Sequence, residues 1–375
     1  MRYFLVCLTI LLISCQKEQA IVDPLEHVLK SDSPLIKIVM DSIHNHEVQI
    51  RYTEISRENG SVSFKDHDFN IDDSTYFYPA SSVKFPVAIL ALEKMQQDGS
   101  YTLNTPFFVE GDTAITTLGA EIKKIFAISD NDAYNRLFEY LGKDYINNSL
   151  NDKGIAPSRI SHRLSTNNAY ELRTKSLVFY ENDSTLNHTE GIDNNAIEEL
   201  QLNNIVKGIG YYANDELIGE PFDFSLKNYL PISTLHDLMK RMVFPEVFPK
   251  DQQFNLSSED RDFLLTSMSS LPKDNGYVSD EYYDSYVKFF MYGDSKEPMP
   301  EHIKIYNKVG YAYGYLTDCA YIKDVKNNID FMVTATIHVN ADGIFNDDAY
   351  EYEEIGIPFL AEIGRQIYNY ELTKK

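Results

Sequence analysis

The hydrophobic pattern near the start of the chain is typical of strands. Apolar and polar residues alternate over residues 48–52 and again over 62–64, as they do in strands with one buried face. Asn59-Gly60 lies between the two segments, and this dipeptide is the strongest short signal for a tight hairpin turn. We therefore expect two antiparallel strands here.

An apolar helix is expected soon after this hairpin. From Val83 to Leu92 the chain is apolar with few interruptions, as in a helix that is buried on nearly every side. Pro86 fits the first turn of such a helix, where a missing N–H group removes no hydrogen bond. Ser81 then lies at the helix start, and Lys84 lies one turn further on the same face.

The middle of the chain, from residue 85 to about residue 300, favours helices. Residues 181–220 are an exception, because they are polar with scattered apolar positions and suggest an insertion or a long surface excursion. Apolar residues at helical spacing predict helices over residues 120–128, 132–141, 235–242 and 263–268.

Strand patterns return near the end of the chain, over residues 303–306, 316–322 and 331–339, and a final helix begins near Pro358. Strands from both ends that enclose a helical middle predict a mixed α/β (α+β) fold. We expect an antiparallel five-stranded sheet built from both chain ends and flanked by helices, with an inserted all-helical lobe.

The first residues differ from the rest. Arg2 precedes an apolar run from Tyr3 to Ile13 that is too short to span a bilayer, and the run ends in Ser14-Cys15. This segment resembles a bacterial lipoprotein signal, and the resemblance implies that Cys15 becomes the lipidated N-terminus of an exported, membrane-tethered protein. A plain secretory signal or a buried N-terminal strand is the alternative. Whether the protein faces the periplasm or the cell exterior stays open.

These patterns divide the chain into three parts. We expect a signal peptide over residues 1–15, a tether over 16–30 and one domain over 31–375. Within the domain, the predicted sheet part comprises residues 31–70 and 300–375, and the helical lobe comprises residues 71–299, with the insertion near 181–220.

Composition narrows the classes of partner. The 375 residues carry a formal net charge of −23, which argues against binding to nucleic acid or to an anionic lipid surface except through the N-terminal lipid. Removal of Cys7 with the signal and lipidation of Cys15 leave Cys319 as the one thiol of the body, so no disulfide is expected. The sequence has no phosphate-cradling glycine loop and no helical His-x-x-x-His pair. We therefore expect a monomer with neither cofactor nor metal, which acts on a small molecule or a peptide.

Ser81 and Lys84 are candidates for a nucleophile and its base. Burial favours the neutral form of a lysine, and a neutral amine can accept the proton of a nearby serine. The same pattern also fits an ordinary helix cap followed by a solvent-exposed lysine. Two further motifs favour the catalytic interpretation over the helix cap. Ser129-Asp130-Asn131 joins two predicted helices, and Lys308-Val309-Gly310 lies close to the first of the late strands.

Together and in this order, the three motifs resemble the Ser-x-x-Lys, Ser-Asp-Asn and Lys-Thr-Gly set of class A β-lactamases and penicillin-binding proteins. The order of the predicted elements is also similar to that family. The resemblance covers nearly everything from Val48 to Tyr368, apart from the excursion.

The resemblance implies a serine hydrolase that forms an acyl-enzyme on Ser81 with an amide, a lactam or an ester, in a site between the sheet and the lobe. Lys84 would be the base, and Ser129 would pass the proton to the leaving group. Backbone N–H groups of Ser81 and Tyr311 would form the oxyanion hole. The remaining implied residues are Lys308, which supplies positive potential, Asn131, which holds the lysine and the substrate amide, and Val309 and Gly310 in the substrate-binding strand.

Three departures from the family pattern affect the expected substrate. Val309 lacks the hydroxyl that helps the family bind a substrate carboxylate, and the following strand has no basic residue, while Asp318 would repel that carboxylate if it faced the site. Glu171 is the one carboxylate near the expected position of the base that activates the deacylating water. The sequence therefore predicts a substrate without the usual carboxylate, slow release of the acyl group and inefficient hydrolysis of β-lactams.

Three alternatives remain open at this point. Two are enzymes, a D-alanyl-D-alanine peptidase of the penicillin-binding-protein type and a true β-lactamase. The third is a non-catalytic envelope lipoprotein that binds a ligand and in which Ser81 is only a helix cap. Acyl transfer to Ser81 separates the enzymes from the binding protein.

Overall fold

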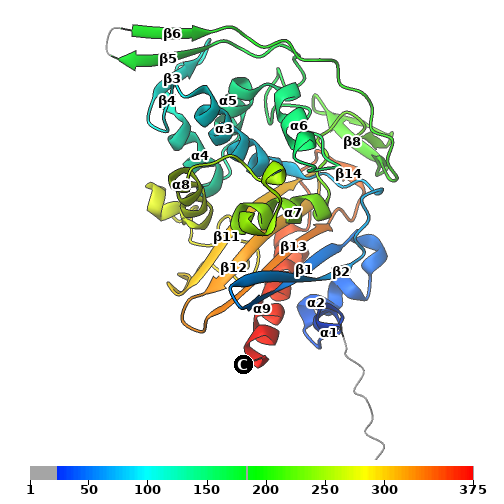
Figure 1. Ribbon diagram of the computed structural model, residues 1–375. Coiled ribbons are helices and arrows are strands. Elements are labelled where there is room, and N and C mark those ends of the chain that lie inside the picture. Colours follow the sequence, from blue (N-terminus) through cyan, green and yellow to red (C-terminus); the bar gives the residue numbers. More distant parts are fainter. Residues whose placement is uncertain (1–22, 183–184, 375) are drawn as a thin grey trace, which may run out of the picture.

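A five-stranded antiparallel sheet unites the two ends of the chain, as predicted (Figure 1). In this computed structural model, which describes residues 23–182 and 185–374, the blue N-terminal strands lie beside the orange C-terminal strands. The strand order is β11-β12-β13-β1-β2, so β11 is an edge strand. The bounds are β1 Gln49–Glu58, β2 Ser61–Phe69, β11 Ile303–Ala312, β12 Tyr315–Asp324 and β13 Ile329–His338.

The hairpin between β1 and β2 turns at Asn59-Gly60. Both residues have positive φ, 51° and 81°, which a two-residue turn matched to the twist of the strands requires. Glycine adopts this conformation without strain, and asparagine adopts it more readily than most residues. The prediction of this hairpin is confirmed.

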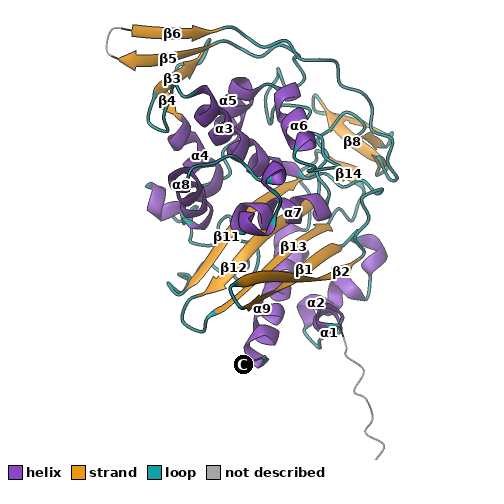
Figure 2. Ribbon diagram, viewed as in Figure 1, coloured by secondary structure: helices purple, strands orange, loops and turns teal. Residues whose placement is uncertain are grey.

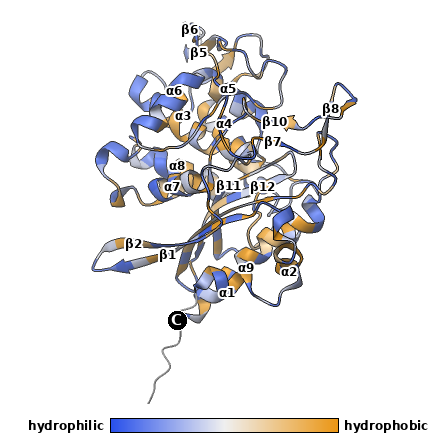
Figure 3. Cartoon of the chain, turned by 90° about the vertical axis from the view of Figure 1, so that its right-hand side faces the viewer, coloured by the Kyte–Doolittle hydropathy of each residue, from blue (hydrophilic) through white to orange (hydrophobic). Residues whose placement is uncertain are grey.

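Three helices cover one face of the sheet: α1 Pro24–Leu29, α2 Pro34–Met40 and α9 Ile357–Thr373. Figure 3 shows hydrophobic residues on α9 next to the sheet. Leu25 and Val28 of α1 are buried in the core that α9 shares with the sheet. This corrects the predicted tether over residues 16–30, because residues 24–29 are part of the folded body. The predicted signal peptide, Cys15 and residues 16–22 lie outside the described residues.

The lobe covers the other face (Figure 2). Helix α7, Ile232–Val243, packs on β1, β12 and β13, and the remaining lobe helices lie beyond it. Among the described residues, no helix combines the length and the apolar character that are needed to cross a membrane. The other lobe helices are α3 Lys84–Asp98, α4 Leu118–Ala127, α5 Asn131–Leu141, α6 Lys143–Asp152 and α8 Ser258–Ser269.

The lobe is not all-helical, which corrects one part of the predicted fold. A four-stranded sheet of order β4-β3-β5-β6 lies at its far end, where the Phe107 and Phe179 rings pack 5.4 Å apart. These strands are too short for a clear alternating pattern, so the sequence did not reveal them. Their bounds are β3 Pro106–Val109, β4 Thr116–Thr117, β5 Leu177–Asn182 and β6 Thr185–Thr189.

The predicted excursion over residues 181–220 is attached to the body. Strand β8 pairs in parallel with β14, and the Lys207 ammonium forms an ion pair with Glu47 at 2.8 Å. Aromatic residues just after it, including Phe224, pack with Tyr78 and Tyr315 in a third core cluster. Its strands and their partner are β7 Val206–Lys207, β8 Gly210–Ala213, β9 Glu216–Ile218, β10 Phe222–Asp223 and β14 Ile344–Phe345.

Candidate active site

A cavity of about 570 Å³ lies where the lobe meets the edge strand β11. The lobe contributes Ser81 and Asn131 to its wall, and the sheet side contributes Tyr311. The remaining wall is rich in tyrosine and also includes His162 and Lys227. The cavity is therefore between the sheet and the lobe, where the sequence predicted a site.

Ser81 lies in a short 3₁₀ helix, Ala80–Val83, that leads into α3. The α-helix itself begins at Lys84, so Ser81 comes one turn before it. Gly310 of β11 packs directly against this turn. A Cβ atom on Gly310 would lie 2.6 Å from the Pro79 carbonyl oxygen and 2.7 Å from the Ser82 nitrogen, both of which are backbone atoms. Only glycine therefore lets the edge strand approach Ser81 this closely.

Lys84 is fully buried, and all the groups that it contacts are neutral. Its Nζ atom donates to the Ser129 carbonyl oxygen and to Asn131 Oδ1 at 2.7 Å, and it lies 3.4 Å from Ser129 Oγ. Burial lowers the pKa of Lys84 to about 7, against a smaller opposing effect of the Asp130 charge. The amine is thus poised between its charged and neutral forms near neutral pH.

Ser129 connects the two buried lysines of the site. The Lys308 Nζ atom donates to Ser129 Oγ at 2.8 Å and to the Val309 carbonyl oxygen at 2.7 Å. Burial and the nearby Lys84 charge hold the pKa of Lys308 well below its usual range. Ser129 has a φ of +57°, a conformation that is strained for serine and that recurs at functional sites.

The Ser129-Asp130-Asn131 motif caps a helix and also contributes two residues, Ser129 and Asn131, to the site. The Asp130 side chain accepts a hydrogen bond from the Ala133 N–H group at 2.7 Å and so begins α5. Asn131 Nδ2 donates to Ser165 Oγ at 3.0 Å, which links α5 to the next loop.

The side chains of Val309 and Asp318 face away from the cavity. They are cross-strand partners in β11 and β12, and Val309 packs in the core beside α9. The buried Asp318 carboxylate accepts from the Phe289 N–H group at 3.0 Å and from Asn307 Nδ2 at 2.8 Å, and burial raises its pKa to about 6. The condition under which Asp318 would repel a substrate carboxylate is therefore not met, because its side chain does not line the cavity.

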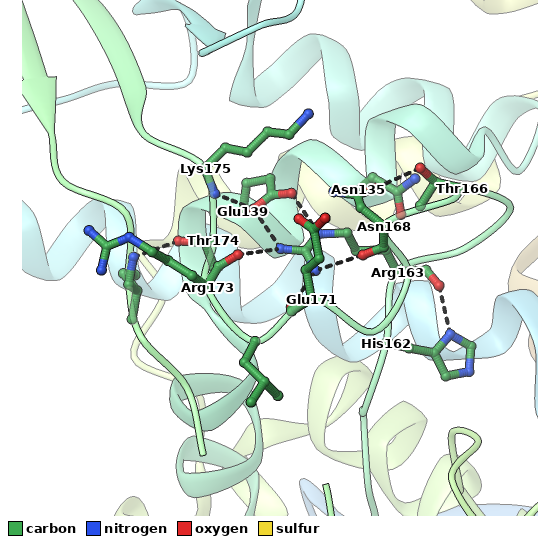
Figure 4. Close-up of polar contacts among 12 residues, drawn as sticks. Asn135, Glu139, His162, Arg163, Thr166, Asn168, Glu171, Arg173, Thr174 and Lys175 are labelled. Carbon is green, nitrogen blue, oxygen red and sulfur yellow. Dashed lines mark hydrogen bonds and ion pairs between the residues drawn. The ribbon is translucent and has the colours of Figure 1, made fainter. Parts of the chain in front are cut away.

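The loop that carries Glu171 is held by a buried ion pair (Figure 4). The Arg163 guanidinium binds both carboxylate oxygens of Glu139, at 2.6 and 2.9 Å, and also donates to the Glu171 carbonyl oxygen at 2.8 Å. The Glu171 side chain is exposed and is not part of the cavity wall. This placement argues against the predicted role of Glu171 as deacylation base.

Two residues of the cavity wall, His162 and Lys227, were missed by sequence reasoning. His162 precedes the Arg163 loop, and Lys227 follows β10. Neither stands in a recognisable motif. Within the described ranges, no three His, Cys, Asp or Glu side chains gather in a way that could hold a metal ion.

Comparisons with known proteins concern part of the sequence and the overall fold. Residues 36–191, which include the Ser81 and Ser129 motifs, match the model of the Beta-lactamase2 family, described as the Beta-lactamase enzyme family. No curated protein matches the chain by sequence.

Solved structures extend the likeness to the whole chain. The β-lactamase from Sphaerobacter thermophilus DSM 20745 aligns over 93% of this chain and 96% of its own, with a TM-score of 0.51 and 15% identity. PBP-A aligns over 95% and 97%, with a TM-score of 0.53 and 15% identity. A β-lactamase from Burkholderia ambifaria aligns over 88% and 96%, with a TM-score of 0.51 and 11% identity. The chain is therefore similar in the sequence of residues 36–191 to the Beta-lactamase enzyme family, and in its overall fold to class A β-lactamases and PBP-A. The resemblance that the three motifs suggested is confirmed.

Proposed function

We propose that the protein is a serine hydrolase that forms an acyl-enzyme on Ser81. The observation that carries this proposal is the environment of Lys84, a buried amine that contacts only neutral oxygens within one helical turn of a serine at a cavity. A lysine that kept its charge there would need an opposite charge nearby. A lysine that serves as a base needs to lose its proton, and this environment favours that loss.

The hydrogen bonds of Lys84 leave the lone pair of its neutral amine available, so that the amine can act as a base. A neutral amine has two N–H groups and one lone pair. The Ser129 carbonyl oxygen and Asn131 Oδ1 are the two close acceptors and would take the two N–H groups. The lone pair then remains for a hydroxyl, either that of Ser81 or that of Ser129.

The proposed reaction moves one proton along this chain of groups. The Ser81 proton passes to Lys84 as the bond between Oγ and the substrate carbonyl carbon forms. Backbone N–H groups of Ser81 and Tyr311 stabilise the oxyanion. Ser129, which is oriented by Lys308, then relays the proton to the leaving nitrogen or oxygen as its bond to carbon breaks. Water hydrolyses the resulting ester and restores the serine.

Release of the acyl group is the slow step of this proposal. No carboxylate of the Arg163 loop lines the described cavity, so this loop supplies no acidic side chain to activate the water. We therefore expect acylation without rapid turnover of β-lactams.

Intact-mass measurement tests the proposal. After incubation with a β-lactam or a fluorophosphonate probe, we expect one adduct on the native protein and none on the Ser81→Ala variant. Ser82→Ala is the matched control, because the neighbouring Ser82 hydroxyl is buried and donates to the Pro79 carbonyl oxygen. The Ser82→Ala variant should keep the adduct. Absence of any adduct, or an adduct that survives the loss of Ser81, contradicts the proposal and leaves the ligand-binding lipoprotein.

Turnover separates the enzyme classes. Rapid hydrolysis of a chromogenic cephalosporin would identify a β-lactamase, and release of D-alanine from a D-Ala-D-Ala peptide would identify a peptidase. We further propose an exported monomer that is anchored through a lipid on Cys15. Mass analysis of the N-terminal peptide from membranes tests the anchor, since an unmodified or uncleaved Cys15 would contradict it.

A further inference from the structure

Lys227 is a half-buried cation in the wall of the Ser81 cavity, surrounded by aromatic rings. Its Nζ atom lies 5.3 Å from the centre of the Tyr170 ring and 5.6 Å from the centres of the Phe222 and Tyr313 rings. Among the described residues, the one polar contact of this ammonium is with the Tyr313 hydroxyl, at 3.4 Å. Aromatic faces attract a cation, but they do not neutralise it.

Two other lysines that lie over aromatic rings, Lys207 and Lys240, form ion pairs, and Lys227 does not. Lys207 forms an ion pair with Glu47 at 2.8 Å, and Lys240 forms one with Asp66 at 2.6 Å. In the part of the chain that the structure describes, no carboxylate lies within ion-pair distance of Lys227. Asp348 also lines the cavity, but it is exposed to solvent. A partly desolvated ammonium without a counter-charge at a cavity wall is suited to an anionic ligand.

The position of Lys227 relative to β11 defines which part of a bound substrate it would contact. Lys308 contacts Ser129, Gly310 packs against the Ser81 turn, and Tyr313 just beyond the strand contacts Lys227. At the rise of a strand, Gly310 and Tyr313 are roughly 10 Å apart. Lys227 therefore lies on the side of Ser81 opposite to Lys308. In the proposed reaction the leaving group lies at the Ser129 end, so the acyl part of the substrate lies at the Lys227 end.

A second group at this end of the cavity also lacks a partner. The His162 ring packs 5.2 Å from Tyr170, and its Nδ1 atom donates to the Arg163 carbonyl oxygen at 2.6 Å (Figure 4). The other ring nitrogen, Nε2, is buried and has no hydrogen-bond partner. Since Nδ1 carries the proton in this bond, Nε2 is an acceptor that an N–H group of a ligand would satisfy.

We propose that Lys227 binds a carboxylate on the acyl side of the scissile bond, so that the substrate is an acylated amino acid or peptide with an anionic acyl portion. The direction of the substrate rests on the proposed function, whereas the anion site itself rests on Lys227 and its surroundings. This carboxylate would lie at the Lys227 end of the cavity, away from Lys308 and Ser129.

A pair of thioesters tests the inference. Succinyl-glycyl and succinamoyl-glycyl thioesters share one leaving group and differ only in a terminal carboxylate or carboxamide on the acyl side. We expect the native protein to be acylated by the carboxylate ester roughly 10- to 100-fold faster at low substrate concentration, as for a charged hydrogen bond. Lys227→Gln should slow acylation by the carboxylate ester far more than by the carboxamide ester and so remove this preference, and Lys227→Arg should keep it.

Lys207→Gln is the matched control. Lys207 also lies over an aromatic ring, that of Tyr315 at 5.6 Å, but it is paired with Glu47 and does not line the cavity. This variant should retain the native preference. Equal rates for the two esters in the native protein, or an equal loss of both rates in Lys227→Gln, would overturn the inference.

Binding of the free acids separates this inference from the proposed function. Titration calorimetry of succinyl-glycine and succinamoyl-glycine against the Ser81→Ala variant needs no acylation. Tighter binding of the dicarboxylate that disappears in Ser81→Ala/Lys227→Gln supports the anion site even if no acyl-enzyme ever forms. Acylation of Ser81 without any such preference leaves the proposed function intact and overturns the anion site.

Discussion

Two buried cations of the lobe, Lys84 and Arg163, differ in what surrounds them. Arg163 is 2% exposed, and its guanidinium binds both carboxylate oxygens of Glu139 and the backbone carbonyls of the following loop. Lys84 is equally buried, but its ammonium meets only the neutral oxygens of Ser129 and Asn131.

The difference shows that the free-energy cost of burying a charge can be met in two ways, one structural and one chemical. A charge that is moved out of water must be compensated by an opposite charge, or the group becomes neutral. Arg163 cannot lose its proton, so it requires Glu139, and the resulting pair fixes the loop over residues 163–175. Lys84 can lose its proton, so the absence of a carboxylate becomes a source of reactivity. The first site is built for stability and the second for proton transfer.

Loss of the Lys84 amine should have the largest effect. In Lys84→Met, we expect the rate of Ser81 acylation to fall roughly 10²- to 10⁴-fold, the contribution of a general base. The same variant should be as stable as the native protein or more stable, because the cost of burying the amine disappears. Timed intact-mass measurements give the acylation rate, and urea unfolding gives the stability.

Lys94→Met is the control for this comparison. Lys94 lies on the same helix, α3, and donates to the Tyr140 carbonyl oxygen at 2.8 Å, away from the cavity. Its removal should leave the acylation rate unchanged. If Lys84→Met were acylated at the native rate, the amine would not be the base.

Loss of the Glu139 carboxylate should lower the free energy of unfolding, whereas loss of the Lys84 amine should lower the acylation rate. Glu139→Gln leaves the Arg163 guanidinium buried and unpaired, which typically costs about 3–5 kcal/mol of unfolding free energy. Urea unfolding measures this loss. The double variant Glu139→Gln/Arg163→Met should recover part of it, because it removes the orphaned charge. A loss below about 1 kcal/mol in the single variant would show that Glu139 does not compensate the charge of Arg163.

The sequence revealed the Lys84 site but not the Arg163 pair. A serine and a lysine one turn apart, inside an apolar run, are readable because the relevant geometry is local. Arg163 and Glu139 are distant in the sequence, and only the packing of the loop against α5 brings them together. Lys227 was missed for the same reason.

The face of the strand decides whether Asp318 affects the cavity, and the sequence leaves this face open. A basic residue or an acid on β12 affects the cavity only if it lies on the appropriate face, and this depends on the register between β11 and β12. That register places Asp318 opposite Val309, on the face away from the lobe. By contrast, the main sheet was predictable, because long alternating strands and the Asn59-Gly60 turn carry strong local signals.

The smallest expected effect is the change of stability for each unit of pH. The pKa of Lys84 is about 7 in the folded protein and about 10.5 in an unfolded chain, so between these values the unfolded state binds more protons at this position. Stability rises with pH wherever the unfolded state binds more protons. The native protein should therefore gain stability relative to Lys84→Met from about pH 7 to about pH 10, by at most roughly 1.4 kcal/mol per pH unit.

Two neighbouring amines must be considered in this comparison. Lys288 also has a pKa lowered to about 7 by burial, but it is present in both proteins, so its contribution cancels. Removal of Lys84 also removes its repulsion of Lys308, which raises the pKa of Lys308 in the folded variant and changes the difference in the same direction.

Glu139→Gln provides the comparison for Lys84→Met over the same pH range. The arginine that it leaves unpaired does not titrate below pH 12, so the stability lost in this variant should stay nearly constant from pH 7 to pH 10. Unfolding in urea at half-unit steps of pH gives both curves. A constant difference between the native protein and Lys84→Met would mean that the amine keeps its proton in the folded state, and Lys84 would then be a structural cation like Arg163.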